Sequence, residues 1–290
     1  MAARGAALTL LSHLRLHYQL VFLSPLFAWG FLLGARVASL RTWVAFVAFH
    51  FFLYGGITAY NSYYDRDEGP VGGLRVPPPV TKGLLGFSIV VQALGFVMAA
   101  WVGPLFACLY LAIAVLSVAY SHPRFRWKAK PIHSLFVVAF GQGTAGFAAG
   151  WLTSGAHWPP AAPERLALGA CVATLATLGL YPLTQLYQID EDRARGDRTF
   201  SVAYGANASF LFSLITLGAA GVCLVMLLAT FGPLDATFGA LGFALLLAGL
   251  LRWRARFQNE TMRNFNAVHW TQFGVSLASL GYVALRLFFV

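Results

Sequence analysis

Charged residues are scarce in this 290-residue chain. Asp, Glu, Lys and Arg together make up 10% of it, whereas hydrophobic residues make up 59%. A water-soluble domain needs more charge than this to cover its surface, so the composition excludes a soluble protein. Acids are the scarcer class, because 10 Asp and Glu stand against 20 Lys and Arg, a formal net charge of +10. On so apolar a chain this excess indicates loops held at an anionic membrane face, and no nucleic acid partner is expected.

Cysteine is also rare, and no cleavable leader is expected before the first hydrophobic run. Cys108, Cys171 and Cys223 all lie inside apolar stretches at spacings that match no metal or redox motif, so we expect them to pack as small apolar side chains. Residues 1–18 contain SHLRLHYQL and no small-residue cleavage pattern. They are predicted to form a cytoplasmic, interfacial segment that leads into the first span.

Hydrophobic runs of about 20 residues, the length that crosses roughly 30 Å of hydrocarbon, recur along the chain. They are solidly apolar rather than alternating, so they predict helices, whose backbone groups pair within the segment, and not barrel strands. They leave no room for a separate soluble domain. Residues 1–290 are therefore predicted to form one all-α polytopic membrane domain with about nine transmembrane helices. The predicted spans are 19–39, 42–63, 83–101, 103–121, 133–152, 166–187, 209–230, 234–251 and 268–289.

Small residues mark one face of the fifth predicted span. They are Gly141, Gly143, Gly146 and Gly150. Glycines spaced in this way let the backbone of a second helix approach closely. The pattern predicts tight helix packing at this face.

Basic residues are distributed unevenly among the loops between the spans. Sixteen of the 20 Lys and Arg fall in the N-terminal tail and in the loops after the second, fourth, sixth and eighth spans. By the positive-inside rule this places the N-terminus and these loops in the cytoplasm and the C-terminus on the opposite side. Eight of the 10 acids lie on the same side, where topology does not require them. These four loops alternate between acidic and basic character, which suggests two related four-helix halves followed by a ninth helix.

The first acidic cluster, NSYYDRDEG from Asn61, lies at the cytoplasmic end of the second span. On a helix Asn61, Asp65 and Glu68 are spaced i, i+4 and i+7 and share one face, whereas Asp67 lies off it. A stripe of oxygen-bearing side chains suits a hard cation such as Mg²⁺. One acid at a helix end is ordinarily only solvated, but an Asn inside an apolar span joined to three acids favours a metal site.

The second acidic cluster, YQIDEDRARGDRT from Tyr187, lies at the equivalent end of the sixth span. Gln188 and Asp192 are spaced i and i+4 and share a helical face. Two acidic faces interleaved with basic loops predict a pocket in which Mg²⁺ and Lys or Arg side chains together hold a diphosphate. The basic candidates are Arg124, Arg126, Lys128 and Lys130 in the loop after the fourth span and Arg193 and Arg198 in the loop after the sixth.

NSYYD after the second span, YSHPR at the end of the fourth and QIDEDRARGDRT after the sixth resemble the UbiA superfamily of intramembrane prenyltransferases. That family holds Mg²⁺ and a prenyl diphosphate with an N-x-x-x-D-x-x-x-D motif and a D-x-x-x-D motif. In the first motif Asn61 and Asp65 match, but the third position falls on Gly69, so Glu68 or Asp67 would have to substitute.

In the second motif the resemblance places Asp192 at the last aspartate and Gln188 at the first. It leaves open whether Asp190, Glu191 or Asp197 replaces the neutral Gln188 as a ligand. It also implies diphosphate-binding residues in the Pro-rich loop after the second span and near the end of the fourth. The implied catalytic residues are Asp65 and Asp192, the implied Mg²⁺ ligands are Asn61, Asp65, Glu68, Asp67, Gln188 and Asp192, and the implied diphosphate-binding residues are Arg75, Lys82, Tyr120, Arg124, Lys128 and Arg198.

The resemblance implies Mg²⁺-dependent transfer of a polyprenyl group from an allylic prenyl diphosphate to a lipophilic, aromatic acceptor through a carbocation. Such a cation needs a dry chamber with aromatic faces, because water would quench it. A UbiA-type terpene cyclase, in which the cation is captured by the chain's own double bonds, is an alternative. A cation-coupled transporter is a more distant one, but the acids cluster at helix ends, whereas coupling sites usually lie near the bilayer midplane.

Overall fold

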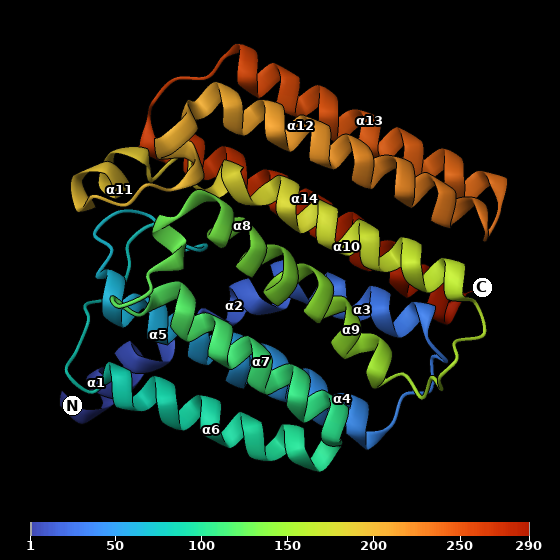
Figure 1. The fold of residues 1–290 in the computed structure, drawn as a ribbon, viewed down its shortest axis with the longest axis horizontal. Helices are drawn as coiled ribbons and strands as arrows, with labels where there is room; N and C mark the ends of the chain where they lie inside the picture. Colours follow the sequence, from blue (N-terminus) through green and yellow to red (C-terminus); the bar gives the residue numbers. More distant parts are fainter. Residues whose placement is uncertain (1, 290) are drawn as a thin grey trace.

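Helices account for most of the chain in the computed structural model, which describes residues 2–289 (Figure 1). Eight helical segments are long and apolar enough to cross a membrane. They correspond to the first eight predicted spans, and α14, which carries more polar residues, occupies the ninth. The all-α prediction is confirmed, and the outermost predicted domain bounds, 1 and 290, lie outside the described residues.

In chain order the helices are α1 (Ala2–Ser12), α2 (Leu16–Tyr18), α3 (Ser24–Leu33), α4 (Leu40–Val47), α5 (Gly55–Asp65), α6 (Leu84–Val102), α7 (Pro104–Ser121), α8 (Pro131–Val138), α9 (Ala145–Leu152), α10 (Pro163–Thr184), α11 (Ile189–Arg195), α12 (Phe200–Ala229), α13 (Pro233–Ala255) and α14 (Thr261–Phe288).

Three of the predicted spans contain π-helical turns. These are η1 (Gln19–Leu23), η2 (Ala48–Tyr54) and η4 (Ala139–Thr144), each continuous with α-helix on both sides. A π-helical turn widens the helix and leaves backbone carbonyls less well paired, and such turns are frequent at functional sites. The buried Tyr54 hydroxyl donates a hydrogen bond of 2.7 Å to the carbonyl oxygen of Gly141, which joins η2 to η4.

The seventh predicted span begins earlier than expected. Helix α12 starts at Phe200 rather than at residue 209, and it is interrupted at Gly205, where φ is +84°. An L-residue with a side chain rarely adopts this backbone conformation, so glycine permits the bend. The segment before the bend therefore returns toward the end of α11 instead of continuing the line of the long helix.

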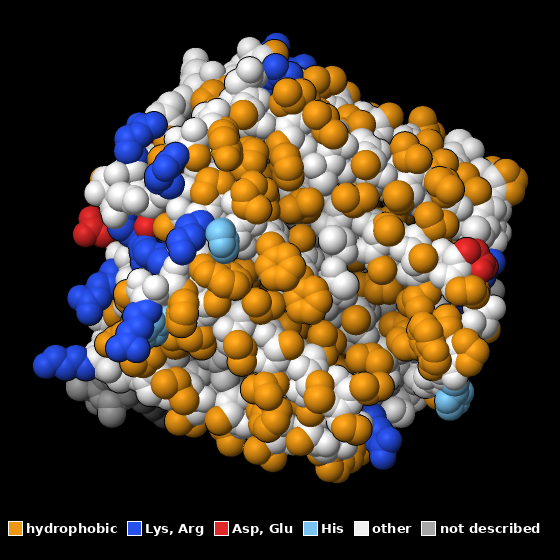
Figure 2. All heavy atoms as spheres, in the orientation of Figure 1, with side chains coloured by type: hydrophobic (Ala, Val, Ile, Leu, Met, Phe, Trp, Pro, Cys, Tyr) orange, Lys and Arg blue, Asp and Glu red, His pale blue; other side chains and the backbone are white. Residues whose placement is uncertain are grey.

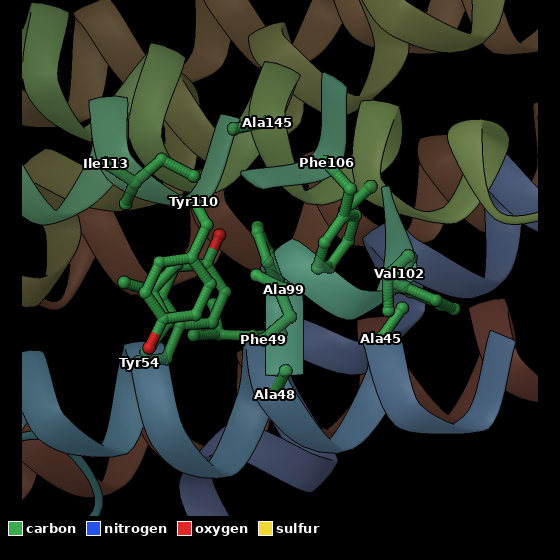
Figure 3. Close-up of a cluster of buried hydrophobic side chains, with 14 residues drawn as sticks. Ala45, Ala48, Phe49, Tyr54, Ala99, Val102, Phe106, Tyr110, Ile113 and Ala145 are labelled. Atoms are coloured by element: carbon green, nitrogen blue, oxygen red, sulfur yellow. The ribbon is translucent and has the colours of Figure 1, made fainter. Parts of the chain in front are cut away.

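Two large hydrophobic cores divide the bundle, beside a third, small cluster around Leu14, Ala59 and Leu84. The larger one is built from α3, α4, η2, α6, α7 and α9 around buried Phe49, Leu53 and Tyr110 (Figure 3). The second joins the end of α10 with α11, α12, α13 and the start of α14 around Leu186, Phe210 and Leu217. We call α1–α9 the N-terminal half and α10–α14 the C-terminal half.

Helices α3 and α9 pack with their backbones in contact. A Cβ atom placed on Gly30 would lie 1.9 Å from the carbonyl oxygen of Phe147, and one on Gly150 would lie 1.9 Å from that of Phe27. The predicted small-residue face is thus a close helix contact at Gly150, and at Gly143, where a Cβ would lie 2.9 Å from the Ala173 carbonyl oxygen of α10. Gly141 is different, because a Cβ there would meet nothing within 4 Å.

Gly150→Ala is expected to destabilise the protein, whereas Gly141→Ala is not. The added methyl group at Gly150 would overlap backbone that cannot move without separating the two helices, and overpacking of this kind costs about 1–3 kcal/mol. Thermal unfolding of the two purified variants in the same detergent provides the measurement. Equal melting temperatures for both variants would contradict this account of the α3–α9 contact.

Charged side chains gather at the end of the bundle that holds α11 and the N-terminus, while the C-terminus lies at the other end (Figures 1 and 2). At that other end Asp235, the third residue of α13, accepts a 2.8 Å hydrogen bond from the Tyr282 hydroxyl and pairs with Arg286 at 3.4 Å. Trp29 of α3 stacks on Tyr282 with ring centroids 5.3 Å apart. These contacts pin α3, α13 and α14 together far from the acidic clusters.

Candidate active site

A cavity of about 970 Å³ lies between the two halves of the bundle. Most of its wall is apolar and comes from α3, α10, α13 and α14, and Trp29 and Tyr282 lie in the wall toward the C-terminal end. At the charged end the wall becomes polar and includes residues of both acidic clusters. The charged and amide side chains there are Arg15, Asn61, Asp65, Asp67, Lys128, Gln185, Gln188, Asp192, Arg195 and Asp197.

Helix α5 ends at Asp65, which changes the predicted ligand stripe. Arg66 follows in the left-handed region with φ +50°, so Glu68 is no longer on a helical face with Asn61 and Asp65. Glu68 is exposed and does not line the cavity, whereas the side chain of Asp67 is 3% exposed and does. The i, i+4, i+7 stripe of the sequence prediction is therefore wrong, and the structure brings Asp67 beside Asp65 in its place.

Asp65 pairs with the basic loop of its own, N-terminal half. Its side chain is 4% exposed and forms an ion pair with Lys128, with Arg126 Nη1 at 3.9 Å from the same carboxylate oxygen. The amide oxygen of Asn61 accepts a 2.9 Å hydrogen bond from the Ser121 hydroxyl at the end of α7. The loop after α7 thus places the ammonium group of Lys128 against the carboxylate of Asp65 at the end of α5.

The second cluster is built by a break between α10 and α11. Residues 185–188 form a turn, and α11 then presents Asp192, which accepts a 3.1 Å hydrogen bond from the Thr199 hydroxyl. Gln188 also lines the cavity. Gly196, with φ +82°, ends α11 and turns the chain so that Asp197 faces the same cavity with a side chain 3% exposed. Of the three acids left open as replacements for Gln188, Asp190 and Glu191 do not line the cavity and Asp197 does.

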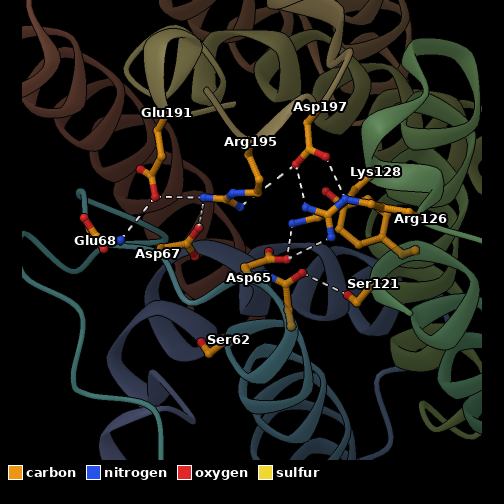
Figure 4. Close-up of polar contacts among 12 residues, drawn as sticks. Ser62, Asp65, Asp67, Glu68, Ser121, Arg126, Lys128, Glu191, Arg195 and Asp197 are labelled. Atoms are coloured by element: carbon orange, nitrogen blue, oxygen red, sulfur yellow. Dashed lines mark hydrogen bonds and ion pairs between the residues drawn. The ribbon is translucent and has the colours of Figure 1, made fainter. Parts of the chain in front are cut away.

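Reciprocal ion pairs join the two halves across the polar end of the cavity (Figure 4). Asp67 of the N-terminal half accepts from Arg195 of the C-terminal half at 3.0 Å. In the other direction, Arg126 donates two hydrogen bonds of 2.6 and 2.8 Å to Asp197. Glu191 accepts from the backbone N–H of Glu68 at 3.1 Å and from Arg195 at 2.8 Å. Each half therefore supplies both an acid and a cation to the other.

The predicted diphosphate-binding residues separate into two groups. Tyr120 and Lys128 line the cavity, and the Tyr120 hydroxyl lies 2.9 Å from that of Tyr181. The other four are exposed and do not line it. These four are Arg75, Lys82, Arg124 and Arg198.

Sequence reasoning did not place three cations of the site among the leading candidates. Arg126 was only one of four basic residues in its loop, and Arg15 belonged to a segment predicted to be interfacial. Arg195 gave no signal that separated it from other loop arginines, since its partner Asp67 lies far away in the sequence. Its spacing of i+4 from Glu191, with which it pairs at 2.8 Å, was the one local clue.

Burial shapes the electrostatics of the C-terminal cluster. It raises the pKa of Asp192 to about 6, although the hydrogen bond from Thr199 and the charges of Arg195 and Lys128 act in the opposite direction. Burial acts to lower the pKa of Arg195, but the negative charges of Asp67 and Asp65 outweigh it and raise that pKa. The ionised carboxylate of Asp192 is thus held at a cost that a bound cation would relieve.

The oxygen donors at this end of the cavity fit Mg²⁺ that is shared with a phosphate ligand. Asn61, Asp65 and Asp67 lie on one side, and Gln188, Asp192 and Asp197 on the other, so every donor is a carboxylate or amide oxygen. Within residues 2–289 no three acidic, His or Cys side chains converge on a single point. Mg²⁺ usually binds through one or two carboxylates and takes its remaining ligands from water and substrate phosphates.

Fold and site together define a multi-pass helical membrane protein with a cluster of buried acids and cations at one end of an apolar cavity. A sequence model of the UbiA prenyltransferase family matches residues 23–277, and the chain belongs to that family. Comparison with curated protein sequences gave no match.

Solved structures share the fold at low sequence identity. A UbiA homologue from Archaeoglobus fulgidus bound to DMAPP and Mg²⁺ is 21% identical, with a TM-score of 0.72 over 97% of this chain and 100% of that one. The apo structure of a UbiA homologue from Aeropyrum pernix K1 is 18% identical, with a TM-score of 0.62 over 89% and 96%. A structure described as digeranylgeranylglyceryl phosphate synthase is 14% identical, with a TM-score of 0.67 over 96% and 98%.

Proposed function

We propose that the protein is a Mg²⁺-dependent intramembrane prenyltransferase that moves a polyprenyl group from an allylic prenyl diphosphate to a lipophilic, aromatic acceptor. The observation that carries the proposal is the pair of acidic sets that face one another at the polar end of an otherwise apolar cavity of about 970 Å³. The A. fulgidus homologue with the same fold was solved with DMAPP and Mg²⁺, and a further structure of it with GPP and Mg²⁺. A prenyl diphosphate needs both kinds of surroundings, the polar end for its charged diphosphate and the apolar wall for its hydrocarbon chain.

The metal ligands of the proposed site are Asn61, Asp65 and Asp67 from the N-terminal half and Asp192 from the C-terminal half, with Gln188 and Asp197 as the remaining oxygen donors facing the cavity. Bound Mg²⁺ would supply Lewis-acid stabilisation of the leaving diphosphate. Lys128 and Arg195 already face the acids and can donate charge-assisted hydrogen bonds to phosphate oxygens.

The rest of the cavity suits the organic part of the reaction. When the allylic C–O bond breaks, its electron pair leaves with the diphosphate, and the carbocation must survive until the acceptor's electrons form the new bond. The acceptor then loses the proton at the carbon that was attacked. The apolar wall excludes water, and aromatic rings in it can stabilise the cation through their π faces. The aromatic residues in the wall are Tyr18, Phe22, Trp29, Tyr54, Tyr120, Tyr181, Tyr187, Phe238, Phe243, Trp253, Trp270 and Tyr282.

The deciding experiment is an assay of diphosphate release by purified protein in lipid nanodiscs. Geranyl, farnesyl and geranylgeranyl diphosphate serve as donors, with Mg²⁺ or with EDTA, and with or without a panel of aromatic acceptors. We expect Mg²⁺-dependent release and a product whose mass is that of the acceptor plus the prenyl group minus one hydrogen. A cyclic hydrocarbon formed equally well without acceptor would instead identify a terpene cyclase, and no release from any donor would overturn the enzyme assignment.

Mg²⁺ binding is expected to weaken as the pH falls through about 6. A carboxylate must lose its proton to bind a metal, and the pKa of Asp192 is raised to about 6 by burial. Below that pH one proton competes with the metal, so the apparent Kd should rise about tenfold per pH unit, whereas above about pH 7 it should be nearly constant. Isothermal titration calorimetry between pH 5 and pH 8 measures this. Asp192→Asn should bind more weakly and show a shallower dependence on pH, and an unchanged profile in that variant would contradict the assignment.

We also propose that the charged end of the bundle faces the cytoplasm. Sixteen of the 20 basic residues belong to the segments predicted on this side. The positive-inside rule then places the acidic clusters and the N-terminus in the cytoplasm and the C-terminus on the opposite side.

A further inference from the structure

Gln142 places an unpaired amide group in the apolar part of the cavity. It is the twelfth of the 22 residues of the span Pro131–Leu152, so it lies near the middle of the membrane. Its side chain lines the cavity, and within residues 2–289 that side chain makes no hydrogen bond or ion pair. Polar side chains are costly at this depth, and those that occur there usually face a cavity or a substrate pathway. The free amide therefore indicates a ligand-binding position away from the acidic clusters.

The backbone around Gln142 is fixed, and there is open space beside it. Gln142 belongs to η4, the π-helical turn between α8 and α9 near the centre of the bundle (Figure 1). The hydrogen bond from Tyr54 to the Gly141 carbonyl holds one side of this turn, and the close contact of Gly143 with the backbone of α10 holds the other. Gly141 also lines the cavity, and a Cβ atom on it would meet nothing within 4 Å. The amide thus has room for a ligand next to it.

Gln142 and the acidic clusters lie at different depths of the cavity. Tyr54, which is bonded to the turn of Gln142, precedes Asp65 by 11 residues in one helical span, about 16 Å at 1.5 Å per residue. A diphosphate held at the acids would place its allylic carbon between these two levels. The prenyl chain contains only carbon and hydrogen, so it offers the amide no hydrogen-bonding partner. The acceptor is the remaining ligand of the proposed reaction.

The surroundings of Gln142 suit a polar group without charge. The cavity wall near it is apolar and includes Val138 of the same span and Ala173 and Ala176 of α10. All charged residues among those that line the cavity lie at its polar end, so an anion beside Gln142 would be buried without a counter-charge. An amide donates to a carbonyl or hydroxyl oxygen and accepts from a hydroxyl group. A neutral hydroxyl or carbonyl group therefore fits this position, whereas a carboxylate does not.

We infer that Gln142 binds the acceptor, and that the acceptor carries an uncharged hydroxyl or carbonyl group on the side of its ring remote from the attacked carbon. The inference rests on the proposed function, because only a transferase has an acceptor. The attacked carbon must lie next to the allylic carbon, near the acids, while the amide holds the opposite edge of the ring. Gln142 thereby determines which carbon of the ring is presented to the cation.

The test measures transfer of the geranyl group to two pairs of acceptors whose members differ by one hydroxyl group. The pairs are hydroquinone with phenol, and 1,4-naphthalenediol with 1-naphthol. The measured quantity is the ratio of kcat/KM for the diol to kcat/KM for the monohydroxy compound. The intrinsic reactivity of the rings contributes to this ratio, but it cancels when variants are compared.

Gln142→Leu is expected to lower this ratio by about 10-fold in at least one pair, because one hydrogen bond to the remote hydroxyl group is lost. The substitution replaces the amide with an apolar side chain of similar size. Gln142→Asn keeps an amide on a shorter side chain and should give an intermediate ratio. The ratio does not depend on the fraction of protein that is folded, so a merely structural role of Gln142 would leave it unchanged.

Gln92→Leu is the matched control, with the same substitution in another span. Gln92 lies on α6 outside the cavity, where its amide donates to the Ser88 carbonyl of its own helix at 3.3 Å. Its ratio should equal that of wild type.

Equal ratios in wild type and Gln142→Leu for both pairs would overturn the inference and leave the proposed function intact. Transfer to 4-hydroxybenzoate but to none of the four neutral acceptors would do the same, since a remote carboxylate would then be the group recognised. Release of diphosphate without transfer to any acceptor would also overturn the inference. Failure of the wild-type protein to release diphosphate from any donor would overturn both the inference and the proposed function.

Discussion

Asp65→Asn and Asp192→Asn are each expected to reduce Mg²⁺-dependent release of diphosphate by about 10²–10³-fold or more. Each substitution keeps the size of the side chain and removes one negative charge from one side of the cavity. Asp65 lies on the N-terminal half beside Lys128, and Asp192 lies on the C-terminal half beside Thr199. A diphosphate held between the halves needs both sides at once, so neither acid should be able to replace the other.

Asp190→Asn is the matched control for this pair. Asp190 belongs to the same short helix as Asp192, but its side chain is 65% exposed and points to Arg193 and Asn259 rather than into the cavity. Its activity should stay within about twofold of wild type, because surface substitutions of this kind have small effects. The assay follows diphosphate release with geranyl diphosphate as donor, and circular dichroism checks the helical content of each variant. Activity within tenfold of wild type in either Asp65→Asn or Asp192→Asn would remove that residue from the catalytic site.

Asp67→Asn is expected to lower activity by about 10²-fold, whereas Glu68→Gln should leave it nearly unchanged. Asp67 is 3% exposed and lies 3.0 Å from Arg195, so its loss removes an oxygen donor from the cavity and leaves a partly buried guanidinium with less compensation. Glu68 is exposed, and only its backbone N–H takes part in the contact between the halves, which glutamine retains.

The comparison of these neighbours tests the end of α5 directly. If the helix continued past Asp65, Glu68 would face the cavity and Asp67 would not, and the two effects would be reversed. Measurement of kcat and KM for both variants under saturating Mg²⁺ distinguishes the two arrangements. A loss in Glu68→Gln larger than that in Asp67→Asn would contradict the observed helix end.

The fold could be predicted from the sequence because length and hydropathy determine it directly in a membrane. A run of about 20 apolar residues has few alternatives to a transmembrane helix, so most of the spans were found to within a few residues. The first span ends earlier than predicted, at Leu33, and the seventh and ninth begin earlier, at Phe200 and Thr261. The exceptions are the places where local backbone conformation overrides periodicity. Gly205 bends α12, and Arg66 ends α5 before the acidic cluster is complete. The π-helical turns were not predicted, since one extra residue in a turn leaves no mark on an apolar sequence.

The candidate site could be predicted only in part, for a physical reason. Spacing identifies residues that share one helical face, and it brought Asn61, Asp65, Gln188 and Asp192 forward, all of which line the cavity. Contacts between halves depend on how the helices assemble, and no local pattern reports them. The pairing of Arg195 with Asp67 and the inward turn of Arg15 are of this kind.

The separation of the two hydrophobic cores means that a ligand at the acidic clusters would add to the coupling of the halves that close helix packing and ion pairs already provide. The acids of the site come from both halves, whose buried apolar clusters do not merge, and the seam at that end is closed by charged contacts such as Arg126 with Asp197. A ligand that touches both acidic clusters therefore acts as a non-covalent cross-link. At 100 times its Kd such a ligand adds about 2.7 kcal/mol to the stability of the assembled state. In the proposed reaction, an opening of this seam would therefore weaken the hold on the product diphosphate.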